Sequence, residues 1–167
     1  HLVLSTLHTN TAAGAITRLE DMGVERFLIT AAVNGVLAQR LIRKLCNQCK
    51  TATELPREIL KSTGLEAFMQ DGSQVVYEAQ GCEACKQTGY RGRIAIHELF
   101  VLDPGAQRAV LDGADAQQLR EHARARGMCT LYEDGLRKVA LGLSALDEVL
   151  RVTQDQNEDP RDESHAA

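Results

Sequence analysis

The feature that most constrains the fold of this chain is a pair of Cys-x-x-Cys motifs. Cys46 and Cys49 form the first motif, and Cys82 and Cys85 form the second. Each motif can present two sulfur atoms from one tight turn. Two such turns facing each other complete the tetrahedral shell of four thiolates that Zn²⁺ prefers, with Zn–S distances of about 2.3 Å. Because four thiolates leave no open position on the metal, this spacing predicts a structural zinc site.

Other uses of these cysteines stay open at this stage. Four thiolates can also bind an iron–sulfur cluster, and paired cysteines can form disulfides in an oxidising compartment. A thiol–disulfide enzyme usually opens a helix with one Cys-x-x-Cys that holds an exposed thiolate of low pKa. The presence of two pairs favours metal over that chemistry. The fifth cysteine, Cys129, is of the kind that more often packs as a small buried apolar residue than binds a metal.

Composition restricts the partners of the chain. Its 167 residues are 44% hydrophobic, which is enough for a packed core, and its formal net charge is -4 with both signs interspersed. We expect no nucleic-acid partner, because a phosphate backbone is bound by a broad basic surface. The most apolar stretch, residues 27–38, is well short of the roughly 20 residues needed to cross a bilayer. We therefore expect no transmembrane segment.

The N-terminal part of the sequence predicts a strand followed by two helices. Residues 2–7 are mostly apolar and partly β-branched, which is typical of a buried strand in a parallel sheet. Since a domain seldom starts with such a strand, we expect partner segments of the same protein to precede it. Asn10 or Thr11 can cap a helix that ends at Gly23. Residues 24–45 have apolar residues at helical spacing and predict a long buried helix.

The rest of the sequence predicts an insertion, a strand and several short helices. Between the two cysteine pairs, Pro56 begins a short helix and residues 75–78 form a strand. Residues 94–101 predict a second strand, and residues 154–167 lack an apolar anchor and predict a disordered tail. The helices of the C-terminal part each have a start signal that can cap them. These signals are Asp103, Asp115, Thr130 and Ser144.

Four side chains are candidates for contacting nucleotide phosphates. His8 directly follows the first predicted strand, and ligands of open α/β sheets gather at the carboxyl ends of strands. Taken alone, its position favours a capping or loop histidine. Arg18, Arg40 and Arg93 offer guanidinium groups that match phosphate oxygens, or they are solvated surface residues. The chain contains no Gly-x-x-x-x-Gly-Lys-Ser/Thr run, so it has no phosphate-cradling loop of its own.

Several of these motifs follow one another in an order that resembles the C-terminal half of the secretion ATPases, which drive type II secretion and type IV pilus assembly. The run HLVLSTLHTN at residues 1–10 is similar to the His box of that family. The paired cysteine motifs follow its pattern, and so do the runs RLEDMGV, AQRL, GYRGR and DGLRK. The resemblance covers residues 1–153 and is closest to the type II secretion branch.

The resemblance implies an α/β fold in three parts, with the tail after them. Residues 1–45 would be the C-terminal part of a RecA-like P-loop ATPase core, and residues 46–92 a tetracysteine zinc insertion. Residues 93–153 would be a return strand and a small helical subdomain. The whole protein would be a cytoplasmic homo-hexamer, peripheral to the inner membrane, that hydrolyses ATP with Mg²⁺ to assemble a pseudopilus. Its partners would be the membrane-embedded secretion platform and coupling proteins.

The resemblance also assigns residues to roles. His8 would act near the terminal phosphate of ATP or the attacking water, and Arg40 and Arg93 would contact the nucleotide, Arg40 alternatively lying at an interface. In that family the phosphate-binding loop and the Walker B carboxylate precede the His box, so we expect this chain to be inactive alone. The competing interpretation is a stand-alone structural zinc module that mediates protein–protein interaction without ATP.

Overall fold

A computed structural model describes residues 1–70 and 72–154. The predicted disordered tail, residues 154–167, lies outside the described residues except for its first position. The chain divides into two compact units. Unit 1 contains residues 1–38 and 97–130, and unit 2 contains residues 39–96 and the chain from residue 131 onward. No helix among the described residues has the length and apolar character that a membrane crossing requires.

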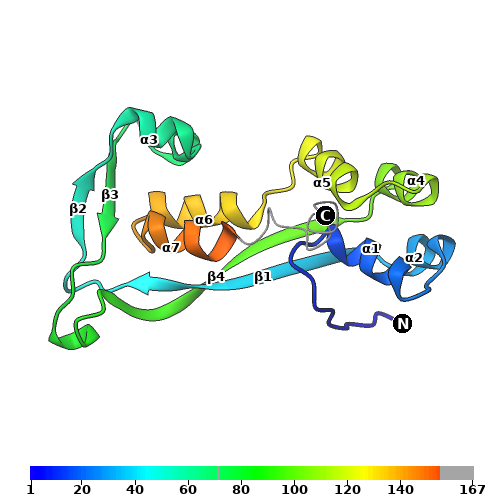
Figure 1. Cartoon of the computed structure of the whole chain (residues 1–167), viewed down its shortest axis with the longest axis horizontal. Helices are drawn as coiled ribbons and strands as arrows, with labels where there is room; N and C mark the ends of the chain where they lie inside the picture. Colours follow the sequence, from blue (N-terminus) through cyan, green and yellow to red (C-terminus); the bar gives the residue numbers. More distant parts are fainter. Residues whose placement is uncertain (71, 155–167) are drawn as a thin grey trace, which may run out of the picture. The chain divides into compact units, whose positions relative to one another are not determined.

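The fold mixes helices with short sheets (Figure 1). The described residues form two two-stranded sheets, β1 with β4 and β2 with β3. The elements in chain order, with η marking 3₁₀ helices, are α1 (Gly14–Asp21), α2 (Arg26–Ala32), β1 (Gly35–Leu45), β2 (Thr51–Glu54), α3 (Arg57–Ser62), η1 (Leu65–Phe68), β3 (Val75–Glu78), η2 (Glu83–Cys85), β4 (Tyr90–Val101), α4 (Pro104–Asp112), α5 (Ala116–Ala125), α6 (Leu131–Ala140) and α7 (Leu146–Thr153).

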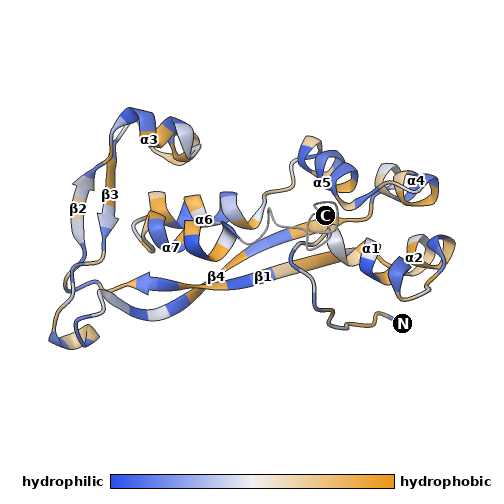
Figure 2. Ribbon diagram, viewed as in Figure 1, coloured by the Kyte–Doolittle hydropathy of each residue, from blue (hydrophilic) through white to orange (hydrophobic). Residues whose placement is uncertain are grey.

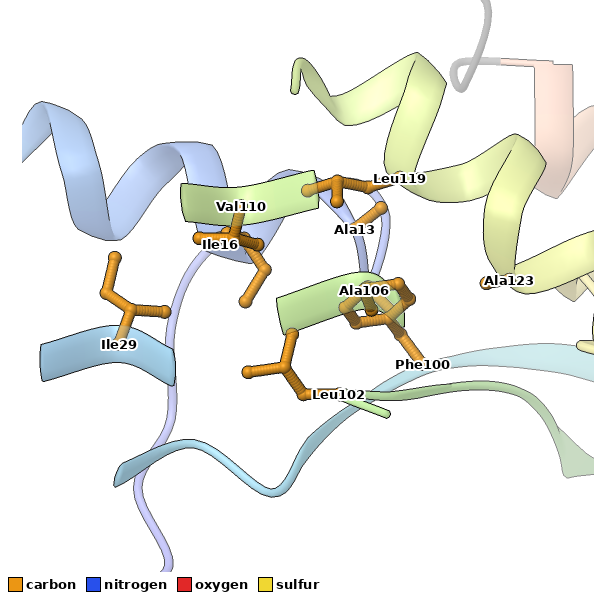
Figure 3. Packing of buried hydrophobic residues seen from close by; sticks show 10 residues of the cluster. Ala13, Ile16, Ile29, Phe100, Leu102, Ala106, Val110, Leu119 and Ala123 are labelled. Carbon is orange, nitrogen blue, oxygen red and sulfur yellow. The ribbon is translucent and has the colours of Figure 1, made fainter. Parts of the chain in front are cut away.

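Unit 1 packs α1, α2, α4 and α5 around one apolar core (Figure 3). Ile16 of α1, Ile29 of α2 and Phe100 of β4 have no more than 1% of their surface exposed. Val110 of α4 and Leu119 of α5 are fully buried in the same cluster. Each side chain of this size contributes about 1.5–3 kcal/mol by leaving water. This core holds the N-terminal helices against the end of β4.

Capping explains where the helices after β4 begin. Asp103 accepts hydrogen bonds from the backbone N–H groups of Gly105 and Ala106, both at 2.8 Å, and so caps α4. Asp115 accepts from the N–H of Gln118 at 2.8 Å, and the Gln118 side chain accepts from the Asp115 N–H at 3.0 Å. These bonds satisfy donors that a helix leaves unpaired at its start. The two predicted start signals are confirmed.

The start of α7 differs from the prediction. Ser144 does not cap this helix, because its hydroxyl donates to the backbone carbonyl of Arg43 at 2.8 Å. The helix begins after Ala145 without a side-chain cap. Helix α6 begins at Leu131, directly after Thr130, where a helix start was predicted. The Ser144 hydroxyl, which the local sequence predicted to cap α7, therefore makes a long-range hydrogen bond instead.

The predicted long helix over residues 24–45 is wrong. The chain forms α2 there and then the strand β1, whose residues alternate between more exposed and more buried positions as far as Ile42. A Cβ on Gly35 would lie 2.9 Å from the carbonyl oxygen of Phe100, so the backbones approach closely at this point. An apolar run of this kind fits either a helix or a strand by periodicity. Pairing with β4, more than fifty residues later, decides for the strand.

The predicted strand over residues 2–7 is also absent from the described structure. Leu2, Val3 and Leu4 are 80%, 79% and 90% exposed, and no regular element is assigned before α1. A strand needs a neighbour to pair with its backbone N–H and C=O groups. No strand of the described residues pairs with this segment, so its backbone stays irregular.

Unit 2 contains the insertion between the cysteine pairs and the last two helices. Strands β2 and β3 run antiparallel, with Thr51 opposite Glu78 and Glu54 opposite Val75. Helices α6 and α7 lie side by side, and Figure 2 shows hydrophobic and hydrophilic positions interleaved along both. The Tyr132 hydroxyl of α6 donates to the carbonyl of Thr63, just after α3, at 2.8 Å. The insertion is therefore fastened to α6.

A matched pair of leucines tests the core of unit 1. Leu119→Ala should lower the free energy of unfolding by about 2–5 kcal/mol, because the fully buried side chain leaves a cavity. Leu111→Ala makes the same chemical change at a 49% exposed position and should cost less than about 1 kcal/mol. Urea denaturation followed by circular dichroism measures both values. Equal losses for the two variants would contradict the assignment of the core.

Candidate metal centre

The first cysteine pair lies in a turn that directly follows β1. The backbone N–H groups of Cys49 and Lys50 donate to the carbonyl of Cys46 at 3.2 and 3.0 Å. These two bonds curl the chain so that both thiols of the pair point to one side. Strand β2 begins at Thr51, immediately after the turn. The pair is thus held between two strands and needs no helix.

The second pair forms a similar turn before β4. The N–H groups of Cys85 and Gln87 donate to the Cys82 carbonyl at 3.2 and 2.8 Å. Lys86 and Gln87 have positive φ angles of 55° and 63°, a left-handed conformation that is uncommon outside glycine. Gly89 follows with φ of 74°, and a Cβ there would lie 2.5 Å from the Cβ of Ala79. Only glycine fits at that position.

The two turns are joined to each other and bring four sulfur atoms together. The N–H of Cys46 donates to the carbonyl of Gly89 at 2.9 Å. The Sγ atoms of all four cysteines lie within 4.8 Å of one another. Cys46 to Cys82 is 3.9 Å, Cys49 to Cys85 is 3.8 Å, and Cys82 to Cys85 is 3.7 Å between sulfurs. The cysteine residues that the sequence predicted as one metal site are therefore placed to hold one ion.

These sulfur separations discriminate between the chemistries that the sequence left open. A tetrahedral ion at about 2.3 Å from each thiolate separates its ligands by about 3.8 Å, which matches the distances observed. A disulfide requires two sulfurs at about 2.0 Å, and all four cysteines are free thiols. A four-iron cluster holds each thiolate on a different iron, which spreads the sulfurs further apart. The geometry fits a single tetrahedral metal ion.

The local environment shifts the pKa values of Cys49 and Cys85 in opposite directions. Desolvation, together with hydrogen bonds to the other thiols, raises the pKa of Cys49 to about 12. Desolvation also opposes ionisation of Cys85, but the N–H groups of Cys82 and Gly89 donate to its sulfur at 3.1 and 3.2 Å. These donors outweigh the desolvation and lower the pKa of Cys85 to about 6. Cys85 is therefore a thiolate at neutral pH and offers the metal its first ligand.

The first turn is tied to the loop between α6 and α7. The Leu45 N–H donates to the carbonyl of Leu143 at 2.9 Å. The Lys50 ammonium donates to the carbonyl of Gly142 at 2.8 Å and lies 4.5 Å from the ring centroid of Tyr77, within the range of a cation–π contact. The residues that flank Cys46 and Cys49 thus hold the C-terminal helices.

An ion-pair network strengthens the same connection. The Glu148 side chain of α7 is fully buried and accepts hydrogen bonds from two guanidinium groups, those of Arg43 and Arg151. The Arg43 guanidinium also lies 4.1 Å from the ring centroid of Tyr90. Desolvation opposes ionisation of Glu148, but bonds from Arg43 and Arg151 outweigh it and lower its pKa to about 2. Glu148 therefore stays ionised and joins β1 to α7.

The three predicted nucleotide contacts are divided between the two units. His8 is exposed and belongs to unit 1, whereas Arg40 and Arg93 belong to unit 2. The Arg40 guanidinium donates to the carbonyl of Val152 at 2.6 Å, which holds it against the end of α7. Arg93 is exposed on β4. Their roles toward a nucleotide stay predictions.

Two buried carboxylates escaped the sequence analysis. Glu148 lies in the predicted last helix, and Glu98 lies in the predicted strand 94–101. One signal for Glu98 was present, because it occupies the same face of the strand as Ile96 and Phe100, where an apolar residue is expected. For Glu148 the buried face of α7 is recognisable only once its partner β1 is known.

Comparison with known proteins matches this architecture to one family. The model of the family described as "Type II/IV secretion system protein" matches residues 1–151. The chain belongs to this family. Its match extends well beyond the metal centre on both sides.

Relatives in the type II/IV secretion family include members of both branches. The chain is 50% identical over 153 residues to a type IV pilus assembly ATPase PilB of Thermus thermophilus, covering 92% of the chain and 17% of that relative. It is 50% identical over 155 residues to the type II secretion system protein HxcR of Pseudomonas aeruginosa, covering 93% and 29%. A type II secretion system ATPase E of Vibrio cholerae is 46% identical, with coverage of 93% and 30%. The chain spans less than a third of the length of these relatives.

Removing a single ligand tests the metal centre of this family member. Cys85→Ser should abolish stable binding of the ion, because the tetrahedral shell loses one of its four thiolates. Cys129→Ser is the matched control and should keep the metal, since Cys129 lies outside the cluster. Elemental analysis gives the metal content and identity, and thiol titration with and without chelator counts the released ligands. A fully folded wild-type chain without metal would contradict the site.

The pH dependence of stability tests the Glu148 network. The folded pKa of Glu148 is about 2 against an ordinary value of 4.5, so its ionised form stabilises the fold above about pH 4.5. This contribution is lost as the pH falls through the folded pKa. Glu148→Gln should cost about 1–3 kcal/mol at pH 7. Its difference from the wild type should shrink toward pH 2.

Glu54→Gln is the control for this measurement, because Glu54 is exposed. Chemical denaturation of the three proteins from pH 7 to pH 2 gives the free energies of unfolding. Metal loss in acid affects all three alike and cancels in the differences. A loss for Glu148→Gln that does not change with pH would show that Glu148 acts without its charge.

Proposed function

We propose that this chain is the C-terminal part of the cytoplasmic ATPase that powers type II protein secretion by assembling a pseudopilus. The observation that carries the proposal is the family match over residues 1–151, with 46% identity to a relative that is itself named a type II secretion system ATPase. The chain is equally identical, at 50%, to a pilus assembly ATPase and to a type II secretion protein, so pilus assembly is the alternative task of the longer protein. Both tasks use the same kind of motor.

The chain carries one portion of that motor. Residues 1–45 form the C-terminal part of a RecA-like core, residues 46–92 form the metal insertion, and residues 93–153 form a return strand with the helical subdomain. ATP and Mg²⁺ bind mainly to residues of the longer protein outside this chain, since the chain has no phosphate-cradling loop. The longer protein is a homo-hexamer, peripheral to the inner membrane.

The metal in this proposal is a structural Zn²⁺. Four thiolates with separations near 3.8 Å leave no open coordination position, so the ion holds the chain in place and performs no chemistry of its own. The bonds from Lys50 to Gly142 and from Tyr132 to Thr63 support a rigid insertion. The insertion presents a surface to the membrane-embedded platform and coupling proteins.

A stand-alone zinc module would contain the same four cysteines, so the metal does not distinguish it from the ATPase. The extent of the family match does, because it includes residues 1–45 and the helices after β4, which a zinc module would not need. The proposal therefore favours the ATPase.

In the ATPase, the candidate residues act on the nucleotide. His8 acts near the terminal phosphate or the attacking water. Exposed Arg93 contacts the nucleotide with its guanidinium. Arg40 already donates to the Val152 carbonyl, which supports a role in holding α7 or an interface over a direct nucleotide contact.

Activity of the longer protein tests the role of His8. His8→Ala should lower kcat for ATP hydrolysis roughly a hundredfold and change KM little, because a group near the transferred phosphate acts mainly in the transition state. His122→Ala is the matched histidine control; its ring pairs with Asp103 at 3.1 Å and serves the fold. A steady-state ATPase assay measures both variants. Unchanged kcat for His8→Ala would remove His8 from the mechanism.

A further inference from the structure

The proposed function leaves one buried carboxylate, that of Glu98, without a role. Glu98 lies on β4 between Ile96 and Phe100 on the inward face, and all three side chains are 0% exposed. Burying a carboxylate is costly unless it is paired and hydrogen-bonded. An apolar side chain would fill this position without that cost. Its presence therefore calls for a function beyond packing.

One partner of Glu98 is far away in the sequence. Its Oε1 accepts a hydrogen bond from the backbone N–H of Ala12 at 2.9 Å, across 86 residues. Ala12 is itself fully buried, so water cannot replace this acceptor. The carbonyl of Ala12 accepts from the N–H of Ala15 at 3.2 Å, which places Ala12 in the turn that begins α1. Glu98 thus supplies a hydrogen-bond acceptor just before this helix.

Local hydrogen bonds also fix the chain between His8 and α1. The Thr9 hydroxyl donates to the Thr11 carbonyl at 3.1 Å, and the Thr11 hydroxyl accepts from the Gly14 N–H at 3.1 Å. Among the described residues, no strand pairs with residues 2–7 on the other side. In the described structure, His8 is therefore held through the turn from Thr9 to Ala12, which follows it in the chain.

We propose that Glu98 is a positioning residue for His8. By holding the Ala12 amide, the buried carboxylate fixes the turn from Thr9 to Ala12 and so sets where the His8 imidazole lies relative to the terminal phosphate. The inference rests on the proposed function of His8 and adds to it a residue 86 positions after Ala12 in the sequence. Glu98 touches no reacting atom; it acts through the backbone.

The test uses the intact ATPase that carries this chain, in two variants that break the bond from opposite ends. Glu98→Leu removes the acceptor with a side chain of similar size, and Ala12→Pro removes the donor, because proline has no backbone N–H. Each should lower kcat for ATP hydrolysis by roughly tenfold to a hundredfold, as expected for a misplaced catalytic group, with KM nearly unchanged. Glu98→Gln should restore most of kcat, because its amide oxygen can still accept from Ala12.

Hydrogen exchange and two further variants distinguish positioning from stability. Exchange of peptides covering residues 8–14 should be at least about tenfold faster in Glu98→Leu. Val110→Ala weakens the same core but leaves both partners of the bond between Ala12 and Glu98 in place, and it should keep kcat. In a His8→Ala background, Glu98→Leu should cause no further loss of kcat, because both changes then remove one effect.

The outcomes separate this inference from the proposed function. If His8→Ala lowers kcat and Glu98→Leu does not, the positioning role is overturned and the proposed function stands. If His8→Ala leaves kcat unchanged, the proposed role of His8 fails and the inference fails with it. If Glu98→Leu does not fold, Ala12→Pro decides: normal kcat in that variant overturns the inference, and a reduced kcat with unchanged KM supports it.

Discussion

Convergence of four sulfur atoms is the constraint on which unit 2 depends. The two cysteine turns are separated by more than thirty residues, yet their sulfurs lie within 4.8 Å of one another. The bond from Cys46 to Gly89 closes the gap between the end of β1 and the start of β4. Closing a loop of that length costs chain entropy, which metal binding can offset. The insertion, its antiparallel strands and its contacts to α6 all follow from this closure.

Away from the cysteine cluster, two buried carboxylates join elements that are distant in the sequence. Glu148 joins β1 to α7 by accepting from two arginines, and Glu98 joins β4 to the start of α1 by accepting from a backbone amide. Glu98 lies 86 residues from Ala12, and Glu148 lies 105 residues from Arg43. Both carboxylates are themselves buried, and hydrogen bonds to buried acceptors are costly to lose. Together they tie the ends of the two long strands to helices in each unit.

The sequence analysis predicted correctly the features that depend on residues close together in the chain. Asp103 and Asp115 were recognisable as caps because their hydrogen bonds span three residues or fewer, and the cysteine spacing predicted the four thiols that the structure brings together. Strand β1 and the true partner of Ser144 depend on segments more than fifty residues away, so the pattern around them was ambiguous. For the same reason neither buried carboxylate could be assigned a partner. Residues 2–7 have the composition of a strand, but a strand forms only with a neighbour.

The metal centre also has a consequence for charge. A divalent ion bound by these four thiolates would leave an excess of negative charge, so the occupied site would be an anion. The amides of Cys82 and Gly89 that point at the Cys85 sulfur supply part of the compensation. A lysine directly follows each cysteine pair, Lys50 after the first and Lys86 after the second. The positive charges of these two lysines, adjacent in sequence to the ligand turns, thus offset part of the negative charge that four thiolates give this stretch of the chain.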